Sequence, residues 1–242
     1  MKAIETRGLR KEYGRVTAVS GLNLTVEAGE LFALLGVNGA GKSTAIRMLS
    51  CLTQPTGGDA LLHGKSILRD AAAVKEMIAV SPQETAVAPG LTVRENLQLM
   101  CGAQGFPRDK QAARIREMTA LLGLEPVIGR LAGKLSGGLQ RRLSIAMALI
   151  SEPRILFLDE PTLGLDVIAR SELWEVIRSL KGRVTIILTT HYMEEAEALS
   201  DRIGVMREGR LLRCGTAAEL KQAAGTDDFE QAFIRIVKEA TV

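Results

Sequence analysis

The stretch Gly36-Val37-Asn38-Gly39-Ala40-Gly41-Lys42-Ser43-Thr44 follows the apolar run Leu31-Phe32-Ala33-Leu34-Leu35 and precedes Ala45-Ile46-Arg47-Met48-Leu49. It fits the pattern G-x-x-x-x-G-K-[ST], which needs a buried strand before it and a helix after it. Glycines let several backbone N–H groups turn into one concavity, and the start of the helix adds partial positive charge there. The stretch therefore predicts a phosphate-binding loop, in which Lys42 reaches the outer phosphates of a nucleotide and Ser43 holds Mg²⁺.

The composition restricts the class of protein. A chain of 242 residues is long enough for one large α/β domain with a sizeable core. Its 31 basic and 28 acidic residues give a net charge of +3, and only 3% of the residues are aromatic. Both values argue against a surface for nucleic acid or stacked bases. We expect no signal peptide and no membrane span, because charges interrupt the N-terminal region and no run reaches about 18 apolar residues.

A second apolar run, Ile155-Leu156-Phe157-Leu158, ends at two acidic residues, Asp159 and Glu160. Such a run is typical of a parallel strand that is buried on both faces. The carboxyl end of this strand is expected beside the phosphate loop, at the edge of the sheet where ligands bind. The pattern predicts Asp159 as a ligand of Mg²⁺ and Glu160 as the group that polarises an attacking water.

Two further polar residues follow predicted strands. His191 comes after Val184 to Leu188 and two threonines, so it is either a contact for the γ-phosphate or a structural histidine. Gln83 follows a short strand near 77–80 and either supplies an amide oxygen to Mg²⁺ or water, or is an ordinary loop residue. Tyr13, in a polar turn, either offers a face for adenine or covers the edge of a sheet.

From residue 91 to 150 the pattern becomes helical. Thr92-Val93-Arg94-Glu95 is a capping box, and a second helix is expected from about Asp109 to Leu122. A third begins at Ser136-Gly137-Gly138, where the serine is an N-cap. A serine and two glycines at a helix start are either another anion site or simply a capped helix.

Taken in order, these motifs resemble those of the ATP-binding subunits of ABC transporters, over essentially the whole chain. The resemblance implies adenine stacking at Tyr13, the phosphate loop at Gly36 to Thr44, and a glutamine loop at Gln83. It also implies a signature that acts on the partner copy, at Ser136, Gly137, Gly138, Leu139 and Gln140. Asp159 would bind the metal, and Glu160 and His191 would act in catalysis. Asp166 would contact the other copy, and Val167 replaces the proline that usually follows it.

The resemblance implies an α/β fold, with the parallel sheet core of a P-loop NTPase (RecA-like), an N-terminal antiparallel β layer and an inserted helical lobe. We expect one ABC ATP-binding domain over 1–242. Residues 1–88 and 151–216 would form the core with its β layer, 89–150 the helical lobe with the signature, and 217–242 a short helical tail. An apolar stripe from Phe229 to Val237 is expected to pack on the domain.

The activity implied is ATP hydrolysis, with ATP and Mg²⁺, that powers transport. Two copies would close around two ATP molecules and drive a separate multi-span membrane permease at the cytoplasmic face of the membrane, with no nucleic-acid partner. The segment Thr190 to Glu197 and the short tail look like those of drug and antibiotic efflux exporters. An alternative is a soluble ABC ATPase of DNA repair or translation, but the interval from Lys42 to Ser136 is too short for a long coiled coil. A monomeric GTPase or kinase would give the signature no role.

Overall fold

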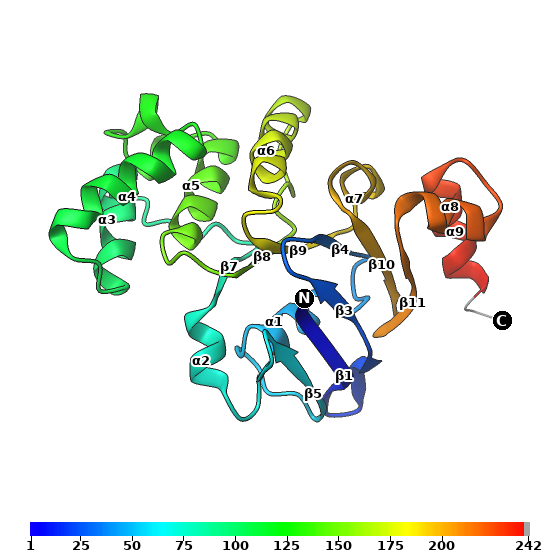
Figure 1. The fold of residues 1–242 in the computed structure, drawn as a ribbon. Helices are drawn as coiled ribbons and strands as arrows, with labels where there is room; N and C mark the ends of the chain where they lie inside the picture. Colours follow the sequence, from blue (N-terminus) through cyan, green and yellow to red (C-terminus); the bar gives the residue numbers. More distant parts are fainter. Residues whose placement is uncertain (240–242) are drawn as a thin grey trace.

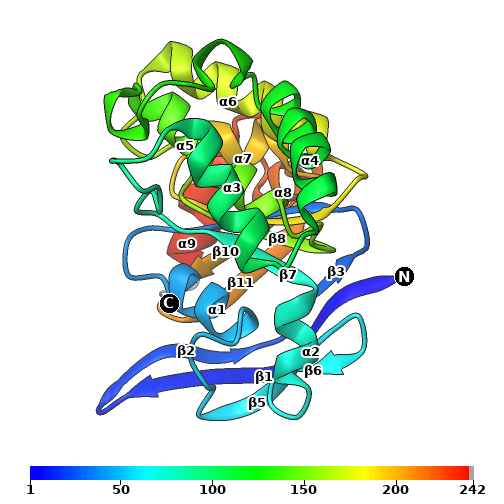
Figure 2. The same ribbon diagram turned by 90° about the vertical axis from the view of Figure 1, so that its left-hand side faces the viewer.

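The computed structural model describes residues 1–239 and contains two β-sheets with helix α1 between them (Figures 1 and 2). The strands are β1 (Lys2–Tyr13), β2 (Val16–Leu22), β3 (Thr25–Glu27), β4 (Leu31–Leu35), β5 (Gly57–Leu62), β6 (Lys65–Ser66), β7 (Ile78–Ser81), β8 (Ile155–Asp159), β9 (Thr185–Thr190), β10 (Arg202–Arg207) and β11 (Arg210–Gly215). The α-helices are α1 (Lys42–Leu49), α2 (Ala71–Glu76), α3 (Val93–Ala103), α4 (Arg108–Leu121), α5 (Gly137–Leu149), α6 (Val167–Leu180), α7 (Met193–Leu199), α8 (Ala217–Ala224) and α9 (Phe229–Glu239). Two 3₁₀ turns, η1 (Glu125–Val127) and η2 (Ala132–Lys134), precede α5.

The larger sheet has the strand order β11-β10-β4-β9-β8-β7. Its strands pair in parallel, except that β11 returns antiparallel to β10. Strand β4, which leads into the phosphate loop, lies between β10 and β9. The carboxyl ends of β4, β8 and β9 therefore meet at one edge, as the three apolar runs predicted.

Burial on both faces explains why these strands read as continuous apolar runs. In β4 the side chain of Leu31 belongs to the core beneath α5 and α6, whereas Phe32 and Leu34 face the core shared with α1 and the second sheet. All five residues of β4 are fully buried. Phe157 of β8 and Ile187 of β9 extend the second of these cores.

The smaller sheet is the antiparallel β layer that the sequence predicted, with the order β2-β1-β5-β6 and with β3 also paired to β1. Strand β1 continues through Lys11 and Glu12 to Tyr13 before a turn at Gly14. Tyr13 is thus the last residue of a strand and not part of the turn.

Helices extend the structure at both ends. Figure 1 shows α3 and α4 at one end and α8 and α9 at the other.

Thr92 and Glu95 form the predicted capping box at the start of α3. The stripe on α9 packs on its own domain, as expected, because Phe229, Phe233 and Ile236 share a core with β4 and β10. In residues 1–239 the structure has no helix that is both long and apolar enough to span a bilayer.

A buried carboxyl group joins the loop after β8 to the helices α6 and α7. Glu195 of α7 is fully buried, and its Oε1 accepts hydrogen bonds from Thr162 Oγ1 at 2.8 Å and from Trp174 Nε1 at 3.2 Å. Burial raises the pKa of the Glu195 carboxyl, and its hydrogen bonds and the charge of Arg170 only partly oppose that shift. The folded state therefore favours the protonated acid.

Replacing Glu195 by Gln should give a stability margin relative to the wild type that becomes more favourable to the variant as the pH rises. Above pH 4.5, the ordinary value, the unfolded chain loses this proton while the folded chain retains it. The wild type thus loses stability as the pH rises toward the folded-state pKa, whereas glutamine does not titrate. Urea unfolding across this range would measure the margin. The exposed neighbour gives the control, since Glu194→Gln should keep the wild-type pH dependence. A margin for Glu195→Gln that is constant with pH would contradict the prediction.

Candidate functional site

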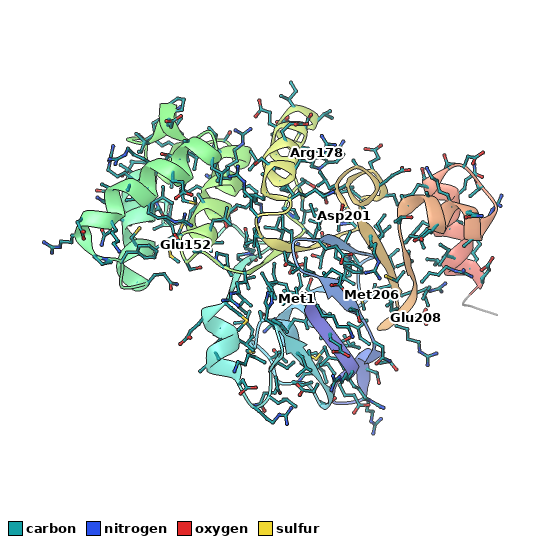
Figure 3. All side chains as sticks on the ribbon, in the orientation of Figure 1. Met1, Glu152, Arg178, Asp201, Met206 and Glu208 are labelled. Carbon is teal, nitrogen blue, oxygen red and sulfur yellow. The ribbon has the colours of Figure 1, made fainter. Side chains whose placement is uncertain are left out.

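The phosphate loop fits closely between neighbouring strands, and this explains its glycines. Gly41 has φ +99°, and a Cβ there would lie 2.4 Å from the carbonyl oxygen of Ala18 in β2. A Cβ at Gly36 would lie 2.3 Å from the carbonyl oxygen of Met206, which Figure 3 labels on β10. Any side chain at either position would push the loop away from the sheets.

Lys42, the first residue of α1, holds its charge inside the loop. Its side chain is only 4% exposed, and Nζ donates to the carbonyls of Gly36 at 2.7 Å and Val37 at 3.3 Å. The same nitrogen lies 3.4 Å from Glu160 Oε1. A buried ammonium group needs such partners, and the carboxylate of Glu160 is the anionic one.

Ser43 and Asp159 lie side by side at the edge of the sheet. Ser43 Oγ donates to Asp159 Oδ1 at 3.1 Å, and Thr189 at the end of β9 also donates to that oxygen. A hydroxyl and a carboxylate oxygen are the hard ligands that Mg²⁺ prefers. The residues present therefore fit the metal that the sequence predicted.

Glu160 follows β8 directly and has the left-handed backbone angle φ +46°. This conformation costs a non-glycine residue about 1–3 kcal/mol. The cost is offset locally, because Glu160 N donates to both the carbonyl and the hydroxyl oxygen of Thr189, each at 3.1 Å. The bend points the carboxylate at His191, whose Nδ1 lies 2.9 Å from Oε2 and donates to it.

Lys42, Ser43, Glu160 and His191 face a cleft of about 720 Å³ between the two sheets, and Asp159 adjoins it through its contact with Ser43. It is lined by Tyr13, Val16, Thr17, Ala18, Asn38, Gly39, Ala40, Gly41, Lys42, Ser43, Thr44, Gln83, Glu160, Leu163, His191 and Glu208. The structure thus brings together most of the predicted nucleotide-binding and catalytic residues, from elements far apart in the sequence. Tyr13 is half exposed at the cleft, with Lys11 Nζ 5.0 Å from the centre of its ring.

The signature residues stand apart, since none of them is among the residues that line this cleft. Ser136 and Gly137 are exposed, and Ser136 Oγ caps α5 by accepting from Leu139 N at 3.4 Å. A Cβ at Gly138 would lie 3.0 Å from Cβ of Ala169, so this glycine allows close packing of α5 on α6. The amide of Gln140 is engaged within its own chain, where Nε2 donates to the carbonyls of Ala132 and Leu135, each at 3.2 Å.

Asp166 is likewise outside the cleft. Its exposed side chain caps α6 by accepting from Ala169 N at 2.9 Å.

Sequence reasoning missed Thr189, which holds both Asp159 and the backbone of Glu160. A threonine at the end of an apolar run, two positions before His191, was the available signal. It also missed Thr17 of β2, which lines the cleft from the neighbouring sheet, and Glu208, which lines it from beyond β10 and is labelled in Figure 3. Local patterns gave no indication of either, because the contact depends on how the two sheets pack.

Known proteins match both the sequence and the fold. The model of the family described as ABC transporter matches residues 19–163. The daunorubicin/doxorubicin resistance ATP-binding protein DrrA of Streptomyces peucetius is 43% identical, over 93% of this chain and 69% of that protein. The Nod factor export ATP-binding protein I of Burkholderia lata is 42% identical, over 94% of this chain and 75% of that protein.

The ABC transporter A family member 2 of Arabidopsis thaliana is 41% identical over 93% of this chain, which spans only 24% of that much longer relative. A solved structure described as the ATP-binding subunit of an ABC transporter superposes with a TM-score of 0.85 at 26% identity, covering 97% of this chain and 99% of that one. With the geometry of the cleft, these matches show that the chain belongs to the ABC transporter family, as an ATP-binding subunit that hydrolyses ATP.

Proposed function

We propose that two copies of this chain close around ATP and drive the export of a small molecule, such as a drug or an antibiotic, through a separate membrane subunit. The observation that supports this most strongly is the convergence of Lys42, the Ser43–Asp159 pair and the Glu160–His191 pair at one cleft. A phosphate-binding cation, a pair of oxygen ligands and a carboxylate base are the parts that hydrolysis of a nucleotide needs.

The loop residues Gly36, Val37, Asn38, Gly39, Ala40, Gly41, Lys42, Ser43 and Thr44 would hold the phosphates, with the adenine against Tyr13. Ser43, Asp159 and Gln83 would hold Mg²⁺, which when bound neutralises charge on the β- and γ-phosphates. Because the phosphates are anions, they compete with Glu160 for Lys42 Nζ. Binding of ATP would thereby release Glu160 Oε1 from its ion pair.

The carboxylate of Glu160 would then accept a proton from the attacking water. His191 holds Oε2 through Nδ1, which fixes the direction of the carboxylate and leaves Oε1 toward the loop. The backbone bend at Glu160, fixed by Thr189, keeps this geometry before substrate arrives. Positioning of the base is thus shared between β8 and β9.

A second copy would complete each site. Ser136 and Gly137 form an exposed helix N-terminus outside their own cleft, and such an end binds anions. We propose that Ser136, Gly137 and Gly138 cover the γ-phosphate bound by the other copy, with Asp166 at the contact between copies. Gln140 would support the helix start from within its own chain and not touch that phosphate.

Export is proposed from the relatives, which are named for drug resistance and for export. These names do not favour the alternative of a soluble ATPase in DNA repair or translation. We propose that the lobe over 89–150 docks on a multi-span permease at the cytoplasmic face of the membrane, while 1–88 and 151–216 form the ATP-binding core. The tail, expected over 217–242, is described to Glu239; it packs on that core, and residues 240–242 lie outside the described part.

Replacing Lys42 by Ala should weaken nucleotide binding and slow hydrolysis, because the cation for the outer phosphates is lost. The rate should fall on the order of 100- to 1,000-fold. Titration with a fluorescent ATP analogue and a phosphate-release assay would measure both. The exposed Lys65 of β6 gives the control, since Lys65→Ala should behave as the wild type. Normal binding and turnover in Lys42→Ala would contradict the assignment of the loop.

Replacing Glu160 by Gln should preserve nucleotide binding but remove the proton acceptor, for a loss of about 100- to 10,000-fold in rate. Glutamine keeps an oxygen for His191 Nδ1, so the local geometry should survive. The variant should accumulate as a dimer in Mg-ATP and not in Mg-ADP, which size-exclusion chromatography detects. Normal turnover, with a monomer in ATP, would show that Glu160 is not the base.

Mixing two inactive variants should restore hydrolysis if each site is shared between copies. Lys42→Ala damages the loop, and Ser136→Asp puts negative charge where the partner's phosphate would approach. Aspartate is itself a good N-cap, so α5 should remain folded. Gly138→Asp is unsuitable, because its side chain would strike Ala169. In the mixed dimer both lesions fall in one site and the other site is intact. If the mixture does not hydrolyse ATP, although cross-linking shows that the heterodimer forms, the sites are not shared between copies.

A further inference from the structure

Arg141, on the flank of α5, is a buried cation that the proposed chemistry does not use. Its side chain is 5% exposed, and its guanidinium donates to the carbonyl of Pro82 at 2.6 Å and to that of Gln83 at 2.5 Å. These carbonyls belong to the loop that carries the Gln83 side chain to the cleft. One side chain therefore joins the signature helix to the loop whose Gln83 would contact the nucleotide.

A second contact lies one turn farther along the same helix face. Ser144 Oγ and Ser81 Oγ are 3.1 Å apart, and both residues are buried. Because positions i and i+3 of a helix share a face, Arg141 and Ser144 meet the end of β7 and the loop after it together. Figure 1 shows α5 beside β7 in this arrangement.

The chemistry of arginine suits this contact in particular. The planar guanidinium presents several N–H donors in a fixed fork, so it binds two successive carbonyls at once, whereas lysine is a point charge. Within the described chain, no ion pair of 4.0 Å or less includes Arg141, so its closest partners are two neutral carbonyl oxygens. Burial lowers the pKa of this guanidinium, and the negative charge of Asp159 opposes that shift. The cation thus lies in the electrostatic field of the Ser43–Asp159 pair.

We infer that Arg141 is a positioning residue that makes the Gln83 loop and the signature helix move as one unit. The inference rests on the proposed function, in which Gln83 contacts the nucleotide of its own copy and Ser136 that of the other. A change at one nucleotide would then reach the other site through the contact of this guanidinium with the two carbonyls.

The test compares Arg141→Met, which keeps a long unbranched side chain, with Arg141→Lys and Arg142→Met. Arg142 is the matched control, because it is the next residue of α5 and pairs with Glu172 of α6 at 2.6 Å instead of binding the loop. Nucleotide affinity and steady-state ATP hydrolysis are measured on the full chain for each.

Arg141 does not line the cleft, so Arg141→Met should bind nucleotide with nearly wild-type affinity. Its kcat should fall about 2- to 30-fold, as for residues along a coupling route, and the Hill coefficient for ATP should approach one. Arg141→Lys should recover part of kcat, because it keeps the charge and can reach one carbonyl. Arg142→Met should match the wild type.

Two results would overturn the inference. The first is Arg141→Met with the kcat and Hill coefficient of Arg142→Met. The second is loss of nucleotide affinity in both Arg141→Met and Arg141→Lys, which would assign the residue a general role in folding. Failure of the proposed function is distinguishable, because it would appear as an inactive wild type or an active Lys42→Ala.

Discussion

Parallel pairing of β4, β9 and β8 is the constraint on which the site depends. Leu35 at the end of β4 pairs with Thr190, and Asp159 at the end of β8 pairs with Thr189. Because all three strands run in the same direction, the residues that follow them emerge at one edge. A slip of one residue in this register would turn Asp159 to the opposite face of the sheet. The hydrophobic strands thus determine where the charged groups meet.

The charges at this edge balance one another before any ligand binds. Lys42 is buried between two carbonyls and the carboxylate of Glu160, which also accepts from His191. A carboxylate in that position takes the place of an anionic phosphate beside the lysine. The proposed binding of ATP is therefore an exchange of one anion for another, and it avoids exposing a buried cation without a partner. In this proposal, the phosphates would replace Glu160 beside Lys42, and the carboxylate of Glu160 would then be free to act as the base.

The sequence was sufficient to predict those parts that depend on local pattern. The phosphate loop has its own spacing, and apolar runs that end in polar residues indicated β8 and β9 together with Asp159, Glu160 and His191. Contacts between distant segments could not be predicted in the same way. Arg141 stands between two polar residues on a helix, so its burial depends on how α5 packs against β7. Glu194 and Glu195 are adjacent glutamates, and nothing in the local sequence shows that one is exposed and the other buried. Their difference in burial depends on the packing of α6 and α7.

One prediction also shows how polarity can mislead. Tyr13 was expected in a polar turn, but it ends an antiparallel strand whose outer part lies near the surface, where the charged side chains of Lys11 and Glu12 are tolerated. Gln140 was assigned to the signature from its place in the sequence. Its amide donates to two carbonyls that precede α5 in the same chain. A polar side chain near a helix start often binds local backbone groups, and the sequence alone could not show these contacts.

Helix α5 carries both the exposed signature residues and the side chain that binds the Gln83 loop. Its first residues are exposed outside their own cleft, whereas its flank one turn later binds the Gln83 loop at the cleft. Because a helix of this length is rigid on the scale of one turn, its N-terminus cannot reorient without moving Arg141 and the two carbonyls that it holds. Gly138 has no side chain, so the helix lies close to α6, which limits the directions in which it can tilt. In the coupling that we infer, a change in the Gln83 loop would therefore become a defined movement of the signature, and would not be dispersed into side-chain rotations.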